Sequence, residues 1–131
     1  MKSLYIHIPF CKSICSYCDF AKMFYNESLA LSYLDELSNE VNNYYKQDML
    51  ETIYIGGGTP SILSKKELNK LFSITNKLNI EPNHEFTIEA NIADINEDFL
   101  SLCKNRIIWK VLWISVRNPA CIRNSSPTTA V

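Results

Sequence analysis

Short apolar runs alternate along the chain with longer segments in which apolar residues recur at three- and four-residue spacing. The short runs cover residues 4–8, 52–55 and 85–90, are rich in Ile, Tyr, Phe or Thr, and each precedes a loop. Runs of this length and composition are typical of buried parallel strands. The pattern therefore predicts three such strands.

The segments between these strands predict amphipathic helices. The first covers residues 27–45, with Asn26 as its N-cap, and a third covers residues 96–103. The second opens at Ser64 with Glu67 three residues later, which is a capping box. The residues expected to face inward are Leu31, Leu34, Leu37, Val41, Tyr44, Leu68, Leu71, Phe72, Thr75, Leu78, Phe99 and Leu102.

The order strand, helix, strand, helix, strand, helix predicts an α/β fold with a parallel sheet. Residues 107–116 could supply a fourth strand. The last residues, 118–131, are rich in Ser, Thr, Pro and Asn and have no helical period, so we expect them to be disordered.

Composition narrows the possible functions. The chain has 131 residues, 47% hydrophobic and 21% charged, which fits a single folded domain. Thirteen Lys and Arg against 14 Asp and Glu give a net charge of −1, and this predicts no nucleic-acid partner. We expect no membrane span and no secretory signal, and therefore a cytoplasmic protein.

The strongest chemical signal is a group of three cysteines directly after the first strand. Cys11, Cys15 and Cys18 form a Cys-x3-Cys-x2-Cys loop. Three thiolates from one short loop can hold three irons of a four-iron cluster. The fourth iron would then be open to a small molecule that chelates it through amine and carboxylate groups.

Zinc or free buried thiols are the alternatives for this loop. Zinc in a structural site takes four ligands, for which His7 or His84 could be proposed. His7 lies within the first strand, where packing or hydrogen bonding near the sheet is the simpler role. The spacing favours a cluster over zinc.

Two further signals follow the second and third strands. Gly56, Gly57 and Gly58, the only glycines in the sequence, could let a ligand approach the backbone, or could simply form a tight turn. Glu89 ends an apolar strand, where a carboxylate needs a cationic or hydroxyl partner unless it faces solvent. Parallel strands place such loops at one rim, so we expect all three signals to meet there.

These residues together resemble the radical S-adenosylmethionine (SAM) proteins, and among them the oxygen-independent coproporphyrinogen III oxidase family. The resemblance covers roughly residues 1–105 and is closest to the haem-chaperone branch. The matching segments are Tyr5-Ile6-His7-Ile8-Pro9-Phe10-Cys11, Cys15-Ser16-Tyr17-Cys18-Asp19-Phe20, Gly56-Gly57-Gly58-Thr59-Pro60-Ser61 and Ile88-Glu89-Ala90-Asn91.

The resemblance implies the cofactors and the residues that bind them. It implies that Cys11, Cys15 and Cys18 hold a [4Fe-4S] cluster and that SAM chelates the open iron. The family chemistry is one-electron reduction of the sulfonium to methionine and a deoxyadenosyl radical. The remaining SAM contacts implied are Tyr5, Tyr17 near the adenine, Gly57, Gly58, Thr59 and Glu89.

One position separates two functions within this family. Coproporphyrinogen dehydrogenases have a fourth cysteine two residues after the third, where this chain has Phe20. Phe20 therefore favours haem binding and transfer, with an acceptor protein and a reductant as partners of the full-length protein. Oxidative decarboxylation of coproporphyrinogen III is the alternative, and an inactive remnant or zinc module is a second one.

Residues 106–131 depart from the family pattern. We expect residues 1–105 to be the N-terminal part of the radical SAM domain, with three to four βα units of a partial TIM-type barrel. A complete barrel has about 250 residues. The hypothesis for the tail is a truncated reading frame whose last residues are out of frame.

Overall fold

A four-stranded parallel sheet forms the centre of the protein. The computed structural model describes residues 2–15, 19, 21–104, 109–113 and 121–123. The strands are β1 (Ser3–Ile8), β5 (Leu50–Gly57), β6 (Ile80–Ala90) and β7 (Trp109–Trp113), and their order in the sheet is β1-β5-β6-β7. Each neighbouring pair is parallel, as the alternating sequence pattern predicts.

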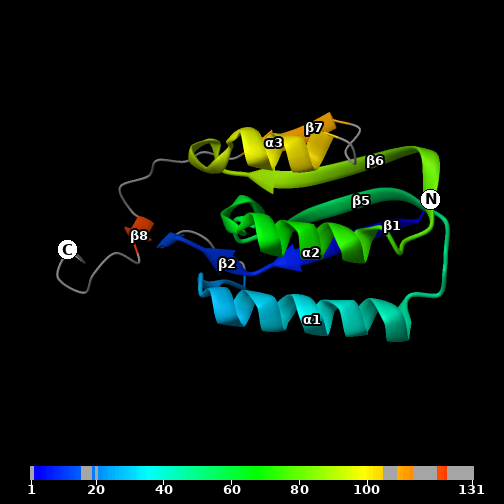
Figure 1. The fold of residues 1–131 in the computed structure, drawn as a ribbon, viewed down its shortest axis with the longest axis horizontal. Helices are drawn as coiled ribbons and strands as arrows, with labels where there is room; N and C mark the ends of the chain where they lie inside the picture. The colour runs from blue at the N-terminus through cyan, green and yellow to red at the C-terminus, as the bar shows by residue number, and fades with distance from the viewer. Residues whose placement is uncertain (1, 16–18, 20, 105–108, 114–120, 124–131) are drawn as a thin grey trace.

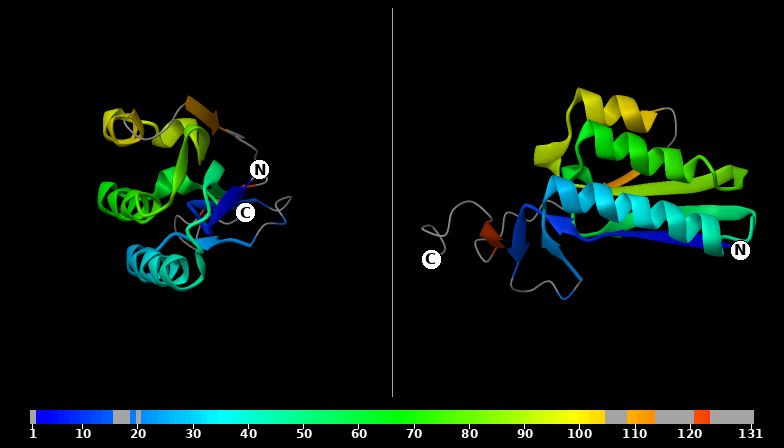
Figure 2. Two further views of the ribbon diagram at one scale, coloured as in Figure 1. Left: turned by 90° about the vertical axis from the view of Figure 1, so that its right-hand side faces the viewer. Right: turned by 60° about the horizontal axis from the view of Figure 1, so that its bottom comes forward.

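One helix follows each of the first three strands. These helices are α1 (Glu27–Tyr44), α2 (Lys65–Thr75) and α3 (Glu97–Lys104), and all three cover the same face of the sheet (Figures 1 and 2). The predicted α/β class, with three βα units and a fourth strand, is therefore confirmed. No helix in the described part of the chain is long and apolar enough to cross a membrane.

Several short elements complete the described chain. Two lie beyond the sheet strands: η1 (Pro60–Ile62) follows β5 and η2 (Ile92–Asp94) follows β6. The others surround the cysteine loop and are β2 (Phe10–Cys11), β3 (Ser13–Cys15), β4 (Met23–Phe24) and β8 (Cys121–Arg123). β2 pairs with β4 in parallel, and β3 pairs with β8 in the antiparallel sense.

The hydrophobic core lies between the sheet and the helices. Alternate residues of each strand face this layer, because successive side chains on a strand point to opposite faces. Their neighbours on the strands, such as Tyr5, Tyr54 and Glu89, lie on the face without helices. The fully buried core residues include Ile8, Phe10, Leu34, Ile53, Ile55, Leu71, Phe72, Phe86 and Ile88.

Both predicted helix caps are present. Asn26 Oδ1 accepts a hydrogen bond of 3.1 Å from the Leu29 N–H, and Ser64 with Glu67 forms the capping box. The predicted inward position of Tyr44 is wrong, since this side chain is 77% exposed. Tyr44 is the last residue of α1.

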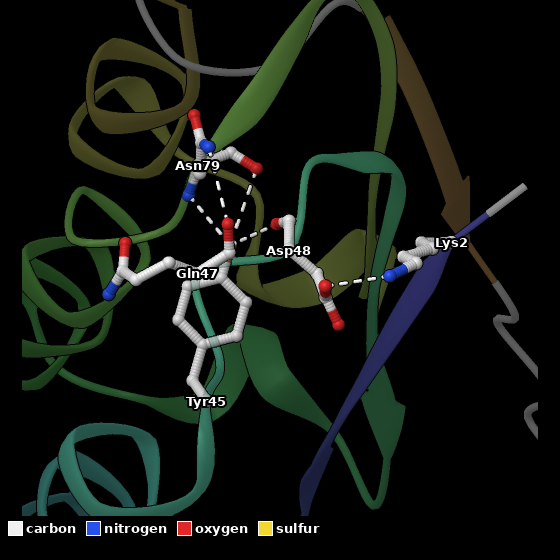
Figure 3. Close-up of polar contacts among 5 residues, drawn as sticks. All are labelled: Lys2, Tyr45, Gln47, Asp48 and Asn79. Atoms are coloured by element: carbon white, nitrogen blue, oxygen red, sulfur yellow. Dashed lines mark hydrogen bonds and ion pairs between the residues drawn. The ribbon is translucent and has the colours of Figure 1, made fainter.

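The loops at the amino ends of the strands are held by Tyr45 (Figure 3). The Tyr45 hydroxyl donates to the Asp48 carbonyl and accepts a hydrogen bond of 2.9 Å from the Asn79 N–H. Asp48 also forms an ion pair of 2.6 Å with Lys2. Gln47, which lies between Tyr45 and Asp48 in the sequence, has a φ of 59°, in the left-handed region.

The tail is partly regular where it is described. β7 lies within residues 107–116, where a fourth strand was expected, and it pairs with β6. We expected residues 118–131 to be disordered, but Cys121–Arg123 form β8. β8 pairs with β3 through backbone groups, and such pairing requires no periodic side-chain pattern. Residues 114–120 and 124–131 lie outside the described part.

Candidate functional site

The three segments predicted to carry chemistry lie at the carboxyl ends of neighbouring strands. The cysteine loop follows β1, and Glu89 is the penultimate residue of β6. The glycines begin within the strand rather than after it as predicted: Gly56 and Gly57 end β5, and Gly58 opens the segment that we call the glycine loop, residues 56–61. All three strands run in the same direction, so these segments share one rim of the sheet (Figure 1). This position is where parallel α/β proteins bind their ligands.

The glycine loop holds the entry to the cysteine loop. The Gly58 N–H donates to the Ile8 carbonyl and the Thr59 N–H donates to the Phe10 carbonyl, each at 2.7 Å. The Thr59 hydroxyl donates a hydrogen bond to Cys11 Sγ, 3.8 Å away. Cys11 is 7% exposed. A hydroxyl donor beside a sulfur can supply a hydrogen bond to that sulfur when it ligates a metal.

Tyr25 holds the exit from the cysteine loop. Its N–H donates a hydrogen bond of 3.0 Å to the Cys11 carbonyl. Its hydroxyl lies 2.9 and 3.0 Å from the two carboxylate oxygens of Glu67 in α2, a fully buried residue. Burial, followed by the hydrogen bond to Glu67, raises the pKa of Tyr25 to about 12. The capping box of α2 is therefore joined to the backbone of the first cysteine.

His7 connects β1 to the chain beyond the cysteine loop. Its Nε2 lies 2.7 Å from the Ala21 carbonyl, and its Nδ1 lies 3.1 Å from the Tyr5 hydroxyl. Nε2 therefore carries the proton and Nδ1 accepts from Tyr5. Both ring nitrogens have protein partners, so this arrangement leaves neither for zinc. His84 lies earlier along β6, where its Nδ1 contacts the Glu81 carbonyl.

Glu89 has two partners within the protein. The Tyr54 hydroxyl donates to Glu89 Oε1 at 2.6 Å, and the Gly57 N–H donates to Oε2 at 3.1 Å. Burial, followed by the hydrogen bond to Glu89, raises the pKa of Tyr54 to about 12. Tyr5 stacks on Tyr54 with a centroid distance of 5.9 Å and is itself 52% exposed. The carboxylate thus faces the open side of the sheet, with lone pairs left for a cation.

The glycines are required by close packing inside the protein. Gly57 has a φ of +111°, and a Cβ there would lie 2.5 Å from His7 Nδ1. A Cβ on Gly58 would lie 2.6 Å from the Phe10 carbonyl oxygen. The sequence alone left open a ligand approach or a tight turn. Packing against β1 and the cysteine loop accounts for these two glycines without a ligand.

Several proposed site residues fall outside the described part. These are Tyr17, Cys18 and Phe20, while Cys15 is described in its backbone, as the last residue of β3. Among the described residues, no three His, Cys, Asp or Glu side chains are grouped to hold a metal. Of the three cysteines expected to bind a cluster, Cys11 is the one whose side chain lies in the described part of the chain, and its buried sulfur with a hydroxyl donor fits an iron–sulfur ligand.

Four residues of the rim were not identified from the sequence as site residues. They are Tyr54, Tyr25, Ser61 and Asp94. Tyr54 could have been found, because strand alternation and parallel register place it beside Tyr5 on the open face. No sequence signal identifies Asp94, whose partners are 33 and 82 residues away.

Comparison with known proteins decides the family. Residues 5–116 match the family model described as the radical SAM superfamily. The chain belongs to the radical SAM superfamily. The match extends past residue 105, where the resemblance was expected to end. Membership implies a [4Fe-4S] cluster and SAM as cofactors.

Two haem chaperones are among the similar relatives. The chain is 37% identical over 128 residues to "Heme chaperone HemW" of Lactococcus lactis, covering 96% of this chain and 34% of that protein. It is 44% identical over 110 residues to the Bacillus subtilis protein of the same name, covering 79% of this chain and 29% of that protein. The chain therefore spans about a third of the length of these relatives.

The fold of this chain is similar to part of a solved structure. Coproporphyrinogen III oxidase (HemN) from Escherichia coli superposes with a TM-score of 0.69 at 28% sequence identity. The superposition covers 79% of this chain and 25% of that enzyme. The expected relation to the N-terminal part of a HemN-like radical SAM fold is therefore confirmed.

Proposed function

We propose that Cys11, Cys15 and Cys18 hold a [4Fe-4S] cluster whose open iron binds SAM. The observation that carries this proposal is the buried Cys11 sulfur, with the Thr59 hydroxyl 3.8 Å away, at the rim that also carries Glu89. The bound cofactors supply one-electron reduction of the sulfonium. The protein's own residues donate a hydrogen bond to the sulfur and exclude water from it.

The rim also has groups suited to the organic part of the cofactor. Glu89 accepts two hydrogen bonds from the protein and keeps lone pairs that can accept from the SAM amino group. Tyr5, Tyr17, Gly57, Gly58 and Thr59 complete the proposed SAM contacts.

We propose haem binding and transfer as the function of the full-length protein. Support comes from the two haem chaperones described above and from Phe20, at the position where the dehydrogenases have a fourth cysteine. The partners would be haem, an acceptor protein and a reductant. The cytoplasm is the proposed compartment, because a reducing environment keeps the three thiols available.

Decarboxylation of coproporphyrinogen III is the second candidate. The similarity of the fold to coproporphyrinogen III oxidase favours it. Phe20 opposes it. Haem and coproporphyrinogen III are therefore the two substrates that must be compared.

Anaerobic reconstitution with iron and sulfide tests the cluster. We expect four irons per chain with a four-iron absorption band, and loss of that band in Cys11→Ala, Cys15→Ala and Cys18→Ala. Cys103→Ala is the matched control, because Cys103 is a buried thiol in α3, away from the rim. Tight one-to-one zinc binding without a cluster, or a cluster insensitive to the three substitutions, contradicts the proposal.

The substrate is tested on the reconstituted chain. We expect a haem absorption change on titration and haem transfer to an apo-haemoprotein. In a parallel assay with SAM and a reductant, coproporphyrinogen III is expected to remain unchanged. Formation of protoporphyrinogen IX would establish the second candidate instead, and failure of both assays would contradict both functions for this chain.

A further inference from the structure

One buried carboxylate connects the three loops of the rim. Asp94 lies in η2, after β6, and its side chain is 7% exposed. Lys12 Nζ, from within the cysteine loop, lies 2.6 Å from Asp94 Oδ1. The Ser61 hydroxyl, from the glycine loop, donates to Oδ2 at 3.1 Å and accepts from the Asn91 N–H at 2.8 Å.

The ion pair between Lys12 and Asp94 matters because of where Lys12 lies in the sequence. Lys12 stands between Cys11 and Cys15, two of the proposed cluster ligands. Its side chain is 70% exposed, so it is not held by packing, and the ion pair with Asp94 fixes its end. Asp94 in turn is held by Ser61, which is 6% exposed. A charge-assisted hydrogen bond to a buried, prearranged acceptor is stronger than an exposed ion pair.

We propose that Asp94 is a positioning residue that holds the cysteine loop, through Lys12, in the arrangement that receives the cluster. This inference rests on the proposed cluster function. Within the described part of the chain, the side chain of Asp94 contacts Lys12 and Ser61, so its effect on the cysteines passes through Lys12. Its effect is to reduce the conformations open to the loop before metal binds, so that less ordering is required when the cluster assembles.

A second lysine–aspartate pair provides a matched control. Lys65 of α2 and Asp98 of α3 lie 3.3 Å apart, with side chains 62% and 68% exposed. Both pairs line the same cavity of about 270 Å³. Lys65 and Asp98 lie outside the cysteine loop. The control therefore removes the same chemical pair beside the same cavity without releasing the loop.

The experiment compares Lys12→Met, Asp94→Asn and their combination with Lys65→Met and Asp98→Asn. Two quantities are measured in the full chain: hydrogen–deuterium exchange of residues 11–15 without metal, and iron release to a chelator after anaerobic reconstitution. We expect Lys12→Met and Asp94→Asn each to accelerate the exchange of residues 11–15 and the release of iron by about tenfold. This factor corresponds to the free energy of one charge-assisted hydrogen bond. The combination should add nothing to either single change, and Lys12→Arg should restore the slow rates.

The outcomes separate this inference from the proposed function. The inference is overturned if Lys12→Met and Asp94→Asn leave the rates of exchange and iron release unchanged, or change them no more than Lys65→Met and Asp98→Asn do. It is also overturned if the two changes multiply each other's effect in the double variant. Lys12→Met decides the matter if Asp94→Asn does not fold, because the exposed Lys12 is not part of the core. If the unmodified chain takes up no iron, the cluster function fails, and hydrogen–deuterium exchange alone decides whether Asp94 holds the loop.

Discussion

The Tyr54 hydroxyl donates a hydrogen bond of 2.6 Å to Glu89 Oε1, and this bond joins β5 to β6 at the functional rim. The second oxygen of Glu89 accepts from the Gly57 N–H at 3.1 Å. A carboxylate held at both oxygens has a fixed direction. Glu89 is therefore prearranged on the open face of the sheet.

Tyr54→Phe should release one oxygen of Glu89. We expect the free energy of unfolding to fall by about 1.5 kcal/mol, the value for a hydrogen bond to a charged group. SAM affinity should fall with it, because Glu89 loses its fixed direction. Urea denaturation and SAM titration measure the two effects. Tyr44→Phe, at a residue 77% exposed, should change neither. Equal stabilities for the two variants would contradict this role of Tyr54.

Stability should decrease at alkaline pH. Folding raises the pKa of both Tyr25 and Tyr54 to about 12, first through burial and then through Glu67 and Glu89 respectively. The folded chain therefore holds these protons more tightly than the unfolded chain. Their contribution is fully present below pH about 10 and is lost as the pH approaches about 12.

Urea denaturation at a series of pH values checks this expectation. The variant Tyr25→Phe/Tyr54→Phe should lose less stability between pH about 10 and about 12 than the unmodified chain. This difference separates the two tyrosines from Cys103, whose pKa burial raises to about 11. Parallel curves for the two proteins would exclude the tyrosines as the cause.

Gly57→Ala should destabilise the rim. Gly57 has a φ of +111°, and the added Cβ would meet the His7 ring at 2.5 Å. We expect a loss of at least about 2 kcal/mol, from backbone strain and steric overlap together. Gln47→Gly should have the opposite effect on stability, because here glycine replaces a residue whose side chain disfavours the left-handed backbone conformation. Gln47 has a φ of 59°, and its replacement should stabilise by about 0.5 kcal/mol. A neutral Gly57→Ala would contradict the packing argument.

The sequence predicted the fold because local patterns determine most of it. Strand composition, the Asn26 cap and the Ser64 capping box are each encoded within a few residues, and the structure has all of them. The start of β6 was missed. This strand begins at Ile80, five residues before the predicted start, with an exposed and polar stretch. Ile80 pairs with Leu50 of β5, and the register then shifts before Glu85 pairs with Thr52, so the start of this strand has no periodic signal.

The candidate site was predictable in location but not in its supporting contacts. The ends of parallel strands meet at one rim, so Cys11, the glycines and Glu89 could be placed together from their order alone. Tyr54 and Asp94 depend on register and on loop contacts between distant segments. Such contacts follow from the assembled sheet, which no single segment encodes.

The partly buried Tyr25 and the buried Glu67 should be strongly coupled. Glu67 is fully buried and accepts from the Tyr25 hydroxyl and from the Ser64 N–H, the latter at 2.7 Å. Tyr25→Phe and Glu67→Gln should each cost about 2 kcal/mol. The first removes a donor from the buried Glu67, and the second replaces the charged acceptor of the Tyr25 hydroxyl and the Ser64 N–H by a neutral amide. The double variant should cost less than the sum, and Glu97→Gln, in the first turn of α3, should cost about 0.5 kcal/mol. Additive losses would show that the two residues act independently.

Tyr45→Phe should lower stability and leave the rim unaffected. Tyr45 joins Asp48 and Asn79 at the amino ends of the strands, opposite the cysteine loop (Figures 1 and 3). Removing its hydroxyl leaves the Asn79 N–H without this acceptor, and we expect a loss of about 1 kcal/mol in urea denaturation. Iron release from the reconstituted chain should keep its rate under conditions where the folded state predominates, because the hydrogen bonds of the Tyr45 hydroxyl in the described part of the chain go to Asp48 and Asn79. A faster release at equal folded fraction would show that the two ends of the sheet are coupled.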